Sequence, residues 1–135
     1  MHREKAFILN LCKYNAPDAA LLNELSEMNL DYPYVLGQLL YNRLGGAAWY
    51  SMERVGLTGK VNREFRTTLK TIYETNIIKG ESLTVALEYL GGILQPADFP
   101  YALLKGSYLL GLYPKGIRTS NDIDILIKFQ RHIAN

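Results

Sequence analysis

Two carboxylates near the C-terminal end of the sequence have the residue type and the spacing of a metal-binding pair. Asp122 and Asp124 are separated by one residue within the otherwise apolar run 122–127. In a β-strand the two side chains would share one face, about 6.6 Å apart along the backbone, with the isoleucines on the other face. Mg²⁺ takes carboxylate oxygens without a full protein cage. The pattern predicts a site for Mg²⁺ or Mn²⁺, and ordinary acids on an exposed strand face are the alternative.

A Gly-Ser turn upstream of this strand has the residue types to hold a phosphate. Gly106 and Ser107 follow an apolar run with strand character at 101–104. Glycine lets a backbone approach a phosphate closely, and Ser107 can offer its amide and hydroxyl at a helix N-terminus. Lys105 and Arg118 would add positive charge beside a phosphate or hold the Asp strand in place. For both cations a structural or solvated role stays open.

The order of these residues resembles the nucleotidyltransferase superfamily, whose members share the DNA polymerase β-like fold. Within that superfamily the chain is similar to a group of bacterial proteins assigned as nucleotidyltransferases. Their pattern is met, in order, by Leu104-Lys105-Gly106, Tyr113-Pro114, Arg118 and Asp122-Ile123-Asp124. The specific match covers 103–127, and the helical part before it resembles the same group more weakly.

The resemblance implies both an activity and a site. The activity would be transfer of a nucleoside monophosphate from a nucleoside triphosphate, such as ATP, to an acceptor hydroxyl that the sequence does not name. Asp122 and Asp124 would be the catalytic, metal-binding pair, because a bound Mg²⁺ or Mn²⁺ spreads the charge of the triphosphate in the transition state. The nucleotide would be contacted by Lys105, Gly106, Ser107 and Arg118.

The sequence departs from the superfamily pattern after Asp124. The superfamily site usually has a third carboxylate on a later strand, and none of the 11 residues after Asp124 is Asp or Glu. Two strands are also too few for a stable sheet. We therefore expect a truncated form of a longer enzyme that lacks a C-terminal segment, or a short homologue that pairs with a second copy. Either polypeptide alone would be a weak or inactive catalyst. A non-catalytic helical interaction module that retains a relic of the motif is the alternative function.

The residues before the motif have predominantly helical patterns, so the predicted fold class is α+β. The predicted division is a helical domain at 1–98 and a partial nucleotidyltransferase core at 99–135, with two strands and a short helix. The clearest long helix is at 61–79, where Phe65, Leu69, Ile72 and Asn76 follow helical spacing. Gly80 is predicted to end this helix, and Ser82 to cap another that continues to Leu90.

Composition narrows the class of protein. The chain has 135 residues, 48% of them hydrophobic, and a formal net charge of +2, so disorder and nucleic-acid binding are both disfavoured. Its single cysteine, Cys12, excludes an intrachain disulfide and fits a reducing compartment. No signal peptide or membrane span is recognisable, so we expect a soluble, cytoplasmic protein. The nearest basic cluster is a helix face more consistent with solvation: Lys60, Arg63, Arg66 and Lys70.

Overall fold

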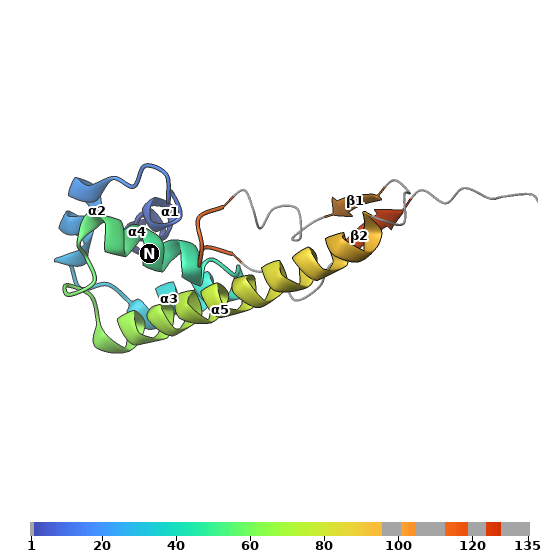
Figure 1. Ribbon diagram of the computed structural model, residues 1–135. Helices are drawn as coiled ribbons and strands as arrows, with labels where there is room; N and C mark the ends of the chain where they lie inside the picture. The colour runs from blue at the N-terminus through green and yellow to red at the C-terminus, as the bar shows by residue number, and fades with distance from the viewer. Residues whose placement is uncertain (1, 96–100, 105–112, 119–123, 128–135) are drawn as a thin grey trace, which may run out of the picture.

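The computed structural model describes residues 2–95, 101–104, 113–118 and 124–127, and this part of the chain is predominantly helical (Figure 1). Its elements, in chain order, are α1 (His2–Leu11), α2 (Ala19–Ser26), α3 (Tyr32–Tyr41), α4 (Gly45–Val55), α5 (Arg63–Leu94), β1 (Tyr101–Leu104) and β2 (Asp124–Ile127). The predicted helical character of the part before the motif is therefore confirmed from His2 to Leu94.

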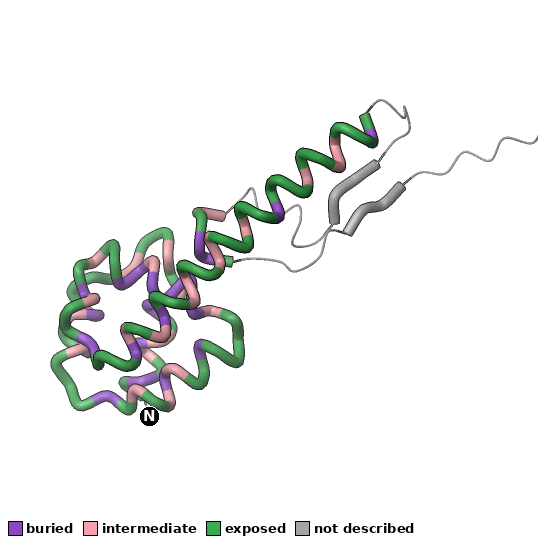
Figure 2. The backbone as a smooth tube through the Cα atoms, turned by 60° about the horizontal axis from the view of Figure 1, so that its bottom comes forward, coloured by how far each residue is buried: buried purple, intermediate pink, exposed green. Residues whose placement is uncertain are grey.

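A hydrophobic core joins α1 to α4 with the first half of α5. Phe7, Tyr32 and Phe65 form an aromatic cluster in it, with ring centroids 5.1–6.5 Å apart. The buried side chains gather in this bundle and become sparse along the rest of α5 (Figure 2). Because each buried large side chain contributes about 1.5–3 kcal/mol, the bundle is the stable base of the molecule. Its largest fully buried hydrophobic residues are Phe7, Phe65, Leu11, Leu22, Leu39, Met52, Leu57, Leu69 and Val35.

Short polar side chains fix where three of the helices begin. Asp18, Asp31 and Asn62 are the N-caps of α2, α3 and α5, and each accepts a hydrogen bond from the backbone N–H three residues later, at 3.1–3.2 Å. Such a cap contributes about 1 kcal/mol. Gly56 ends α4 in the left-handed conformation, with φ of 72°. These local signals agree with the sequence patterns that predicted helices here.

The prediction that Gly80 ends the long helix is wrong. The helix α5 runs through Gly80 and Ser82 without interruption and is 32 residues long. One glycine in a helix interior costs only about 1 kcal/mol relative to alanine, and it ends a helix when it takes a left-handed conformation. Among the described glycines that conformation occurs at Gly56 and Gly116. The apolar stripe of α5 instead continues through buried Leu83 and Leu94.

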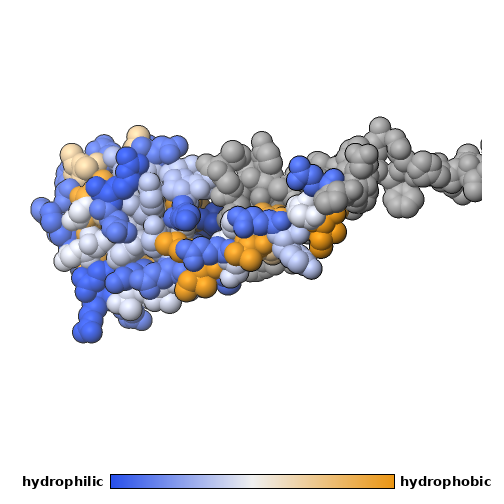
Figure 3. Space-filling view, viewed as in Figure 1, coloured by the Kyte–Doolittle hydropathy of each residue, from blue (hydrophilic) through white to orange (hydrophobic). Residues whose placement is uncertain are grey.

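The second half of α5 extends beyond the helical bundle (Figure 1). Part of its surface is hydrophobic (Figure 3), and its exposed large apolar side chains are Ile78, Val85, Tyr89 and Ile93. Within the described ranges, each of the helices is too short or too polar to cross a bilayer.

The strands β1 and β2 form one antiparallel pair toward the C-terminal end of α5 (Figure 1). Tyr101 pairs with Ile127 at one end of the ladder, and Leu104 pairs with Asp124 at the other. The strand β1 matches the predicted run 101–104, and β2 lies within the predicted second strand, whose Asp122 lies outside the described residues. A pair of strands is not an α/β core, so the nucleotidyltransferase core and the domain division after residue 98 stay predictions.

Candidate functional site

The six predicted site residues are divided between the described and undescribed parts of the chain. Arg118 lies in the described segment 113–118, and Asp124 is the first residue of β2, where the backbone alone is described. Outside the described residues are Lys105, Gly106, Ser107 and Asp122.

The strand register brings the two halves of the motif to the same end of the ladder. Leu104, the last residue of β1, is the Cα partner of Asp124, the first residue of β2. In an antiparallel pair the end of one strand lies beside the beginning of the other. The backbone that continues into Lys105 therefore leaves β1 next to Asp124. The tertiary structure thus places Asp124, a predicted metal ligand, beside the last described residue before the predicted phosphate-binding turn.

The segment Tyr113–Arg118, which lies between the motif halves in the sequence, is attached to the helical bundle. Asn76 Nδ2 on α5 donates a hydrogen bond to the carbonyl oxygen of Gly116, at 3.0 Å. Ile117 is 5% exposed, so it belongs to the buried interior. The sequence placed Asn76 on the apolar stripe of a helix but gave it no role. A polar amide in an apolar stripe needs a hydrogen-bond partner, and this requirement could have indicated that Asn76 contacts another segment.

Two glycines allow the backbone of this segment to approach the helices closely. A Cβ on Gly46 of α4 would overlap the carbonyl oxygen of Gly116 and lie 2.7 Å from that of Ile117. Gly116 itself has φ of 88°, a conformation that favours glycine. A Cβ there would lie 2.5 Å from Cδ2 of Tyr73. Gly46 and Gly116 thus make the docking of residues 113–118 sterically possible.

Aromatic rings hold the beginning of the segment against the N-terminal part of the bundle. The Tyr113 ring meets Tyr14 edge-on at 6.1 Å, and Tyr14 meets Tyr50 of α4 at 6.4 Å. The Arg54 guanidinium lies 5.9 Å from the Tyr50 ring centroid and donates a hydrogen bond to the carbonyl oxygen of Tyr14 at 2.6 Å. Each aromatic pair contributes about 0.5–1.5 kcal/mol beyond its buried area. Tyr113 is therefore fixed at one side while Gly116 is fixed at the other.

The partly buried Tyr73 side chain lies between α5 and the docked segment. Burial raises the pKa of its phenol above the ordinary value of 10.0, and the Glu53 carboxylate and Tyr50 raise this pKa further. The neutral phenol is therefore favoured beside Gly116. Tyr73 was not a predicted site residue, because its position opposite Gly116 depends on a contact between distant segments.

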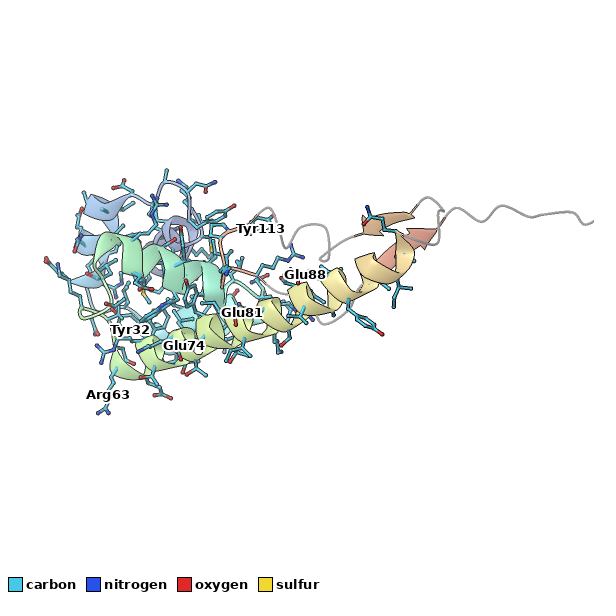
Figure 4. All side chains as sticks on the ribbon, in the orientation of Figure 1. Tyr32, Arg63, Glu74, Glu81, Glu88 and Tyr113 are labelled. Atoms are coloured by element: carbon cyan, nitrogen blue, oxygen red, sulfur yellow. The ribbon has the colours of Figure 1, made fainter. Side chains whose placement is uncertain are left out.

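A cavity of about 570 Å³ lies between α5 and the segment 113–118. Arg118, a predicted nucleotide-contacting residue, is one of its lining residues, and Glu81 lines it from α5 (Figure 4). Lys115, which was not among the predicted site residues, also lines it. The signal for this cavity was absent from the sequence, since its two walls are distant segments.

The metal site itself stays a prediction. Within the described residues no group of three or more His, Cys, Asp or Glu side chains could hold a metal ion. The predicted pair includes Asp122, which lies outside those residues.

Comparison with known proteins adds one finding on the family. Residues 29–132 match the model of a protein family described as uncharacterised nucleotidyltransferase. The match begins just before α3 and includes both motif halves and the docked segment. No curated protein and no solved structure gives a significant match.

Proposed function

The chain belongs to the family of uncharacterised nucleotidyltransferases, and from this we propose that its motif serves the transfer of a nucleoside monophosphate from a nucleoside triphosphate to an acceptor hydroxyl. The reaction would need Mg²⁺ or Mn²⁺, and the triphosphate, for example ATP, would be the donor. The proposed setting is the cytoplasm. The family membership does not favour the alternative of a non-catalytic interaction module.

The observation that carries this proposal is the family match over a range that contains the whole motif. The matched residues 29–132 include the Gly106-Ser107 turn and the Asp122–Asp124 pair. The pairing of Leu104 with Asp124 supports it as well, because the two parts of the motif must act on one nucleotide. The docked segment between them connects this region to the helical bundle.

The proposed reaction forms one bond and breaks one bond at the α-phosphorus of the donor. The acceptor oxygen bonds to the α-phosphorus and releases its proton to solvent, while the bond to the bridging oxygen breaks and pyrophosphate leaves. Asp122 and Asp124 would hold the metal ion, because two carboxylates are a suitable donor set for it. When bound, the ion supplies charge neutralisation for the triphosphate. Gly106 and Ser107 would bind phosphate oxygens through the backbone and the hydroxyl.

Arg118 and Lys105 are the proposed cationic contacts of the phosphates. Arg118 precedes Asp122 by four residues, so the two Cα atoms lie at most about 14 Å apart. The guanidinium is exposed on the cavity side of the docked segment. An arginine at this place is able to reach a phosphate oxygen with two hydrogen bonds.

The test is metal-dependent nucleotide binding by the full 135-residue chain. ATP would be titrated by calorimetry with and without Mg²⁺, using the wild type, Asp122→Asn and Asp124→Asn. The matched control is Asp18→Asn, because asparagine caps a helix as well as aspartate does. We expect binding that requires Mg²⁺, is lost in both site variants and is kept in the control. Absence of binding by folded wild type would contradict the proposal and is what an interaction module predicts.

A further inference from the structure

We propose that the cavity between α5 and residues 113–118 is the acceptor site, and that it takes a small hydroxylated molecule carrying a phosphate monoester, such as a sugar phosphate. The inference rests on the proposed transferase function and assigns its second substrate. The motif residues do not identify this substrate, whereas the residues that line the cavity indicate the chemistry of its ligand.

The size of the cavity limits the kind of acceptor. Its volume of about 570 Å³ lies within the range of small-molecule sites, about 300–1,000 Å³. The lining is partly apolar, with Ile77 and Val85 from α5 and Pro114 from the opposite wall. A metabolite-sized ligand fits this description, whereas a folded protein would need an open surface.

The α5 wall of the cavity presents hydrogen-bond acceptors. Glu81 contributes a carboxylate, and its side chain is labelled on α5 in Figure 4. Thr84 Oγ1 donates its proton to the carbonyl oxygen of Gly80 at 2.9 Å, so its oxygen is left to accept. Asn76 uses its Nδ2 on Gly116, which leaves Oδ1 as an acceptor. A ligand at this wall should therefore donate hydrogen bonds, as the hydroxyl groups of a sugar do.

The opposite wall of the cavity presents positive charge. Lys115 and Arg118 line it from the docked segment, and both side chains are exposed. Across the described ranges, the ion pairs of the protein include neither of these cations, nor Glu81. Two cations that form no ion pair among the described residues favour an anionic group on the ligand. The two walls together select a molecule with hydroxyl groups on one side and an anion on the other.

The same charges distinguish the acceptor from the nucleoside triphosphate donor. Its described lining residues include two cations and one carboxylate, so a triphosphate placed there would bring several negative charges beside Glu81. Like charges in one site are unfavourable, whereas one phosphate monoester is matched by Lys115, and Arg118 is then available to the donor phosphates. Arg118 lines the cavity and precedes Asp122 by only four residues, so the cavity wall is close along the chain to the proposed metal-binding pair.

The test uses ribose 5-phosphate as the probe, titrated calorimetrically into the full chain without nucleotide or metal. Ribose and inorganic phosphate, titrated separately, show which part of the probe is recognised. The variants are Lys115→Gln and Glu81→Gln, both at exposed positions, and circular dichroism checks their folding. The matched controls are Lys79→Gln and Glu74→Gln, which are exposed on α5 outside the cavity.

We expect ribose 5-phosphate to bind more tightly than ribose or phosphate alone. Lys115→Gln and Glu81→Gln should each weaken binding roughly tenfold, because each removes a charged partner, while the controls bind as wild type does. Equal binding by Lys115→Gln and wild type, or no binding by wild type, would overturn the inference. Displacement of the probe by ATP with Mg²⁺ would overturn it too, because the cavity would then be the donor site. Failure of this test leaves Mg²⁺-dependent ATP binding intact, whereas failure of the proposed function removes that binding.

Discussion

Asn76 donates a hydrogen bond from Nδ2 to the carbonyl oxygen of Gly116 at 3.0 Å, and so joins the middle of α5 to a residue 40 positions away in the sequence. This contact fixes the segment that precedes the Asp122–Asp124 run. The same segment forms one wall of the cavity and carries Arg118. The helical bundle therefore fixes the position of residues 113–118, which form one wall of the proposed site.

Replacing Asn76 should destabilise the protein. In Asn76→Ala the buried carbonyl of Gly116 loses its hydrogen-bond donor, and an unsatisfied buried group costs about 1–3 kcal/mol. Urea denaturation measures this free energy of unfolding. Asn29→Ala, at an exposed position, is the control and should change it by less than about 0.5 kcal/mol. Equal stability of the two variants would mean that the contact does not contribute.

Alanine at Gly46 and at Gly37 should have opposite effects on stability. Both glycines lie inside helices, where alanine is favoured by about 0.5–1 kcal/mol. A Cβ at Gly37 meets nothing within 4 Å, so Gly37→Ala should stabilise the fold by that amount. At Gly46 the new methyl group would overlap the backbone of residues 116 and 117, and we expect a net loss of about 1–3 kcal/mol. Thermal denaturation of both variants tests this pair, and stabilisation by Gly46→Ala would show that the segment is not docked on α4.

Gly116→Ala should be more destabilising than Gly56→Ala, although both glycines have positive φ. The left-handed conformation alone costs an alanine about 1–2 kcal/mol, and this is the full effect expected at Gly56, where a Cβ meets nothing within 4 Å. At Gly116 the methyl group would also press on the Tyr73 ring, adding about 1 kcal/mol or more. Chemical denaturation measures the difference, and equal costs at the two sites would contradict the close contact.

Tyr73 should make the protein less stable at alkaline pH. Burial, followed by Glu53 and Tyr50, raises the pKa of Tyr73 above 10.0 in the folded state, so the unfolded chain releases this proton first. The stabilising contribution is complete below pH 10.0 and is lost as the pH rises through the folded-state pKa. Tyr73→Phe keeps the aromatic ring and removes the ionisable hydroxyl group.

Denaturation of the wild type and Tyr73→Phe over a series of alkaline pH values compares the two slopes. We expect the stability of the wild type to fall more steeply than that of the variant above pH 10.0. Parallel profiles would mean that the Tyr73 phenol ionises equally easily in the folded and unfolded chains.

Much of the helical architecture could be predicted from the sequence, because the deciding interactions are local. Asp31 and Asn62 cap the helices that follow them, and the stripe that contains Phe65 and Leu69 defines the buried face of α5. The motif at Gly106-Ser107 and Asp122–Asp124 was recognised from order and spacing, and the family match over residues 29–132 agrees with it. The metal and nucleotide contacts of these residues stay predictions.

The sequence by itself thus determined the helical character of the part before the motif and the family, since periodicity and motif order depend on residues close in the chain. Only the tertiary structure decided that α5 continues through Gly80, because burial of Leu83 outweighs the small cost of one glycine. It also decided that the backbone of Gly116 packs closely on Gly46 and accepts a hydrogen bond from Asn76. These contacts and the cavity beside them form between segments that are distant in the sequence, so no local sequence pattern predicts them.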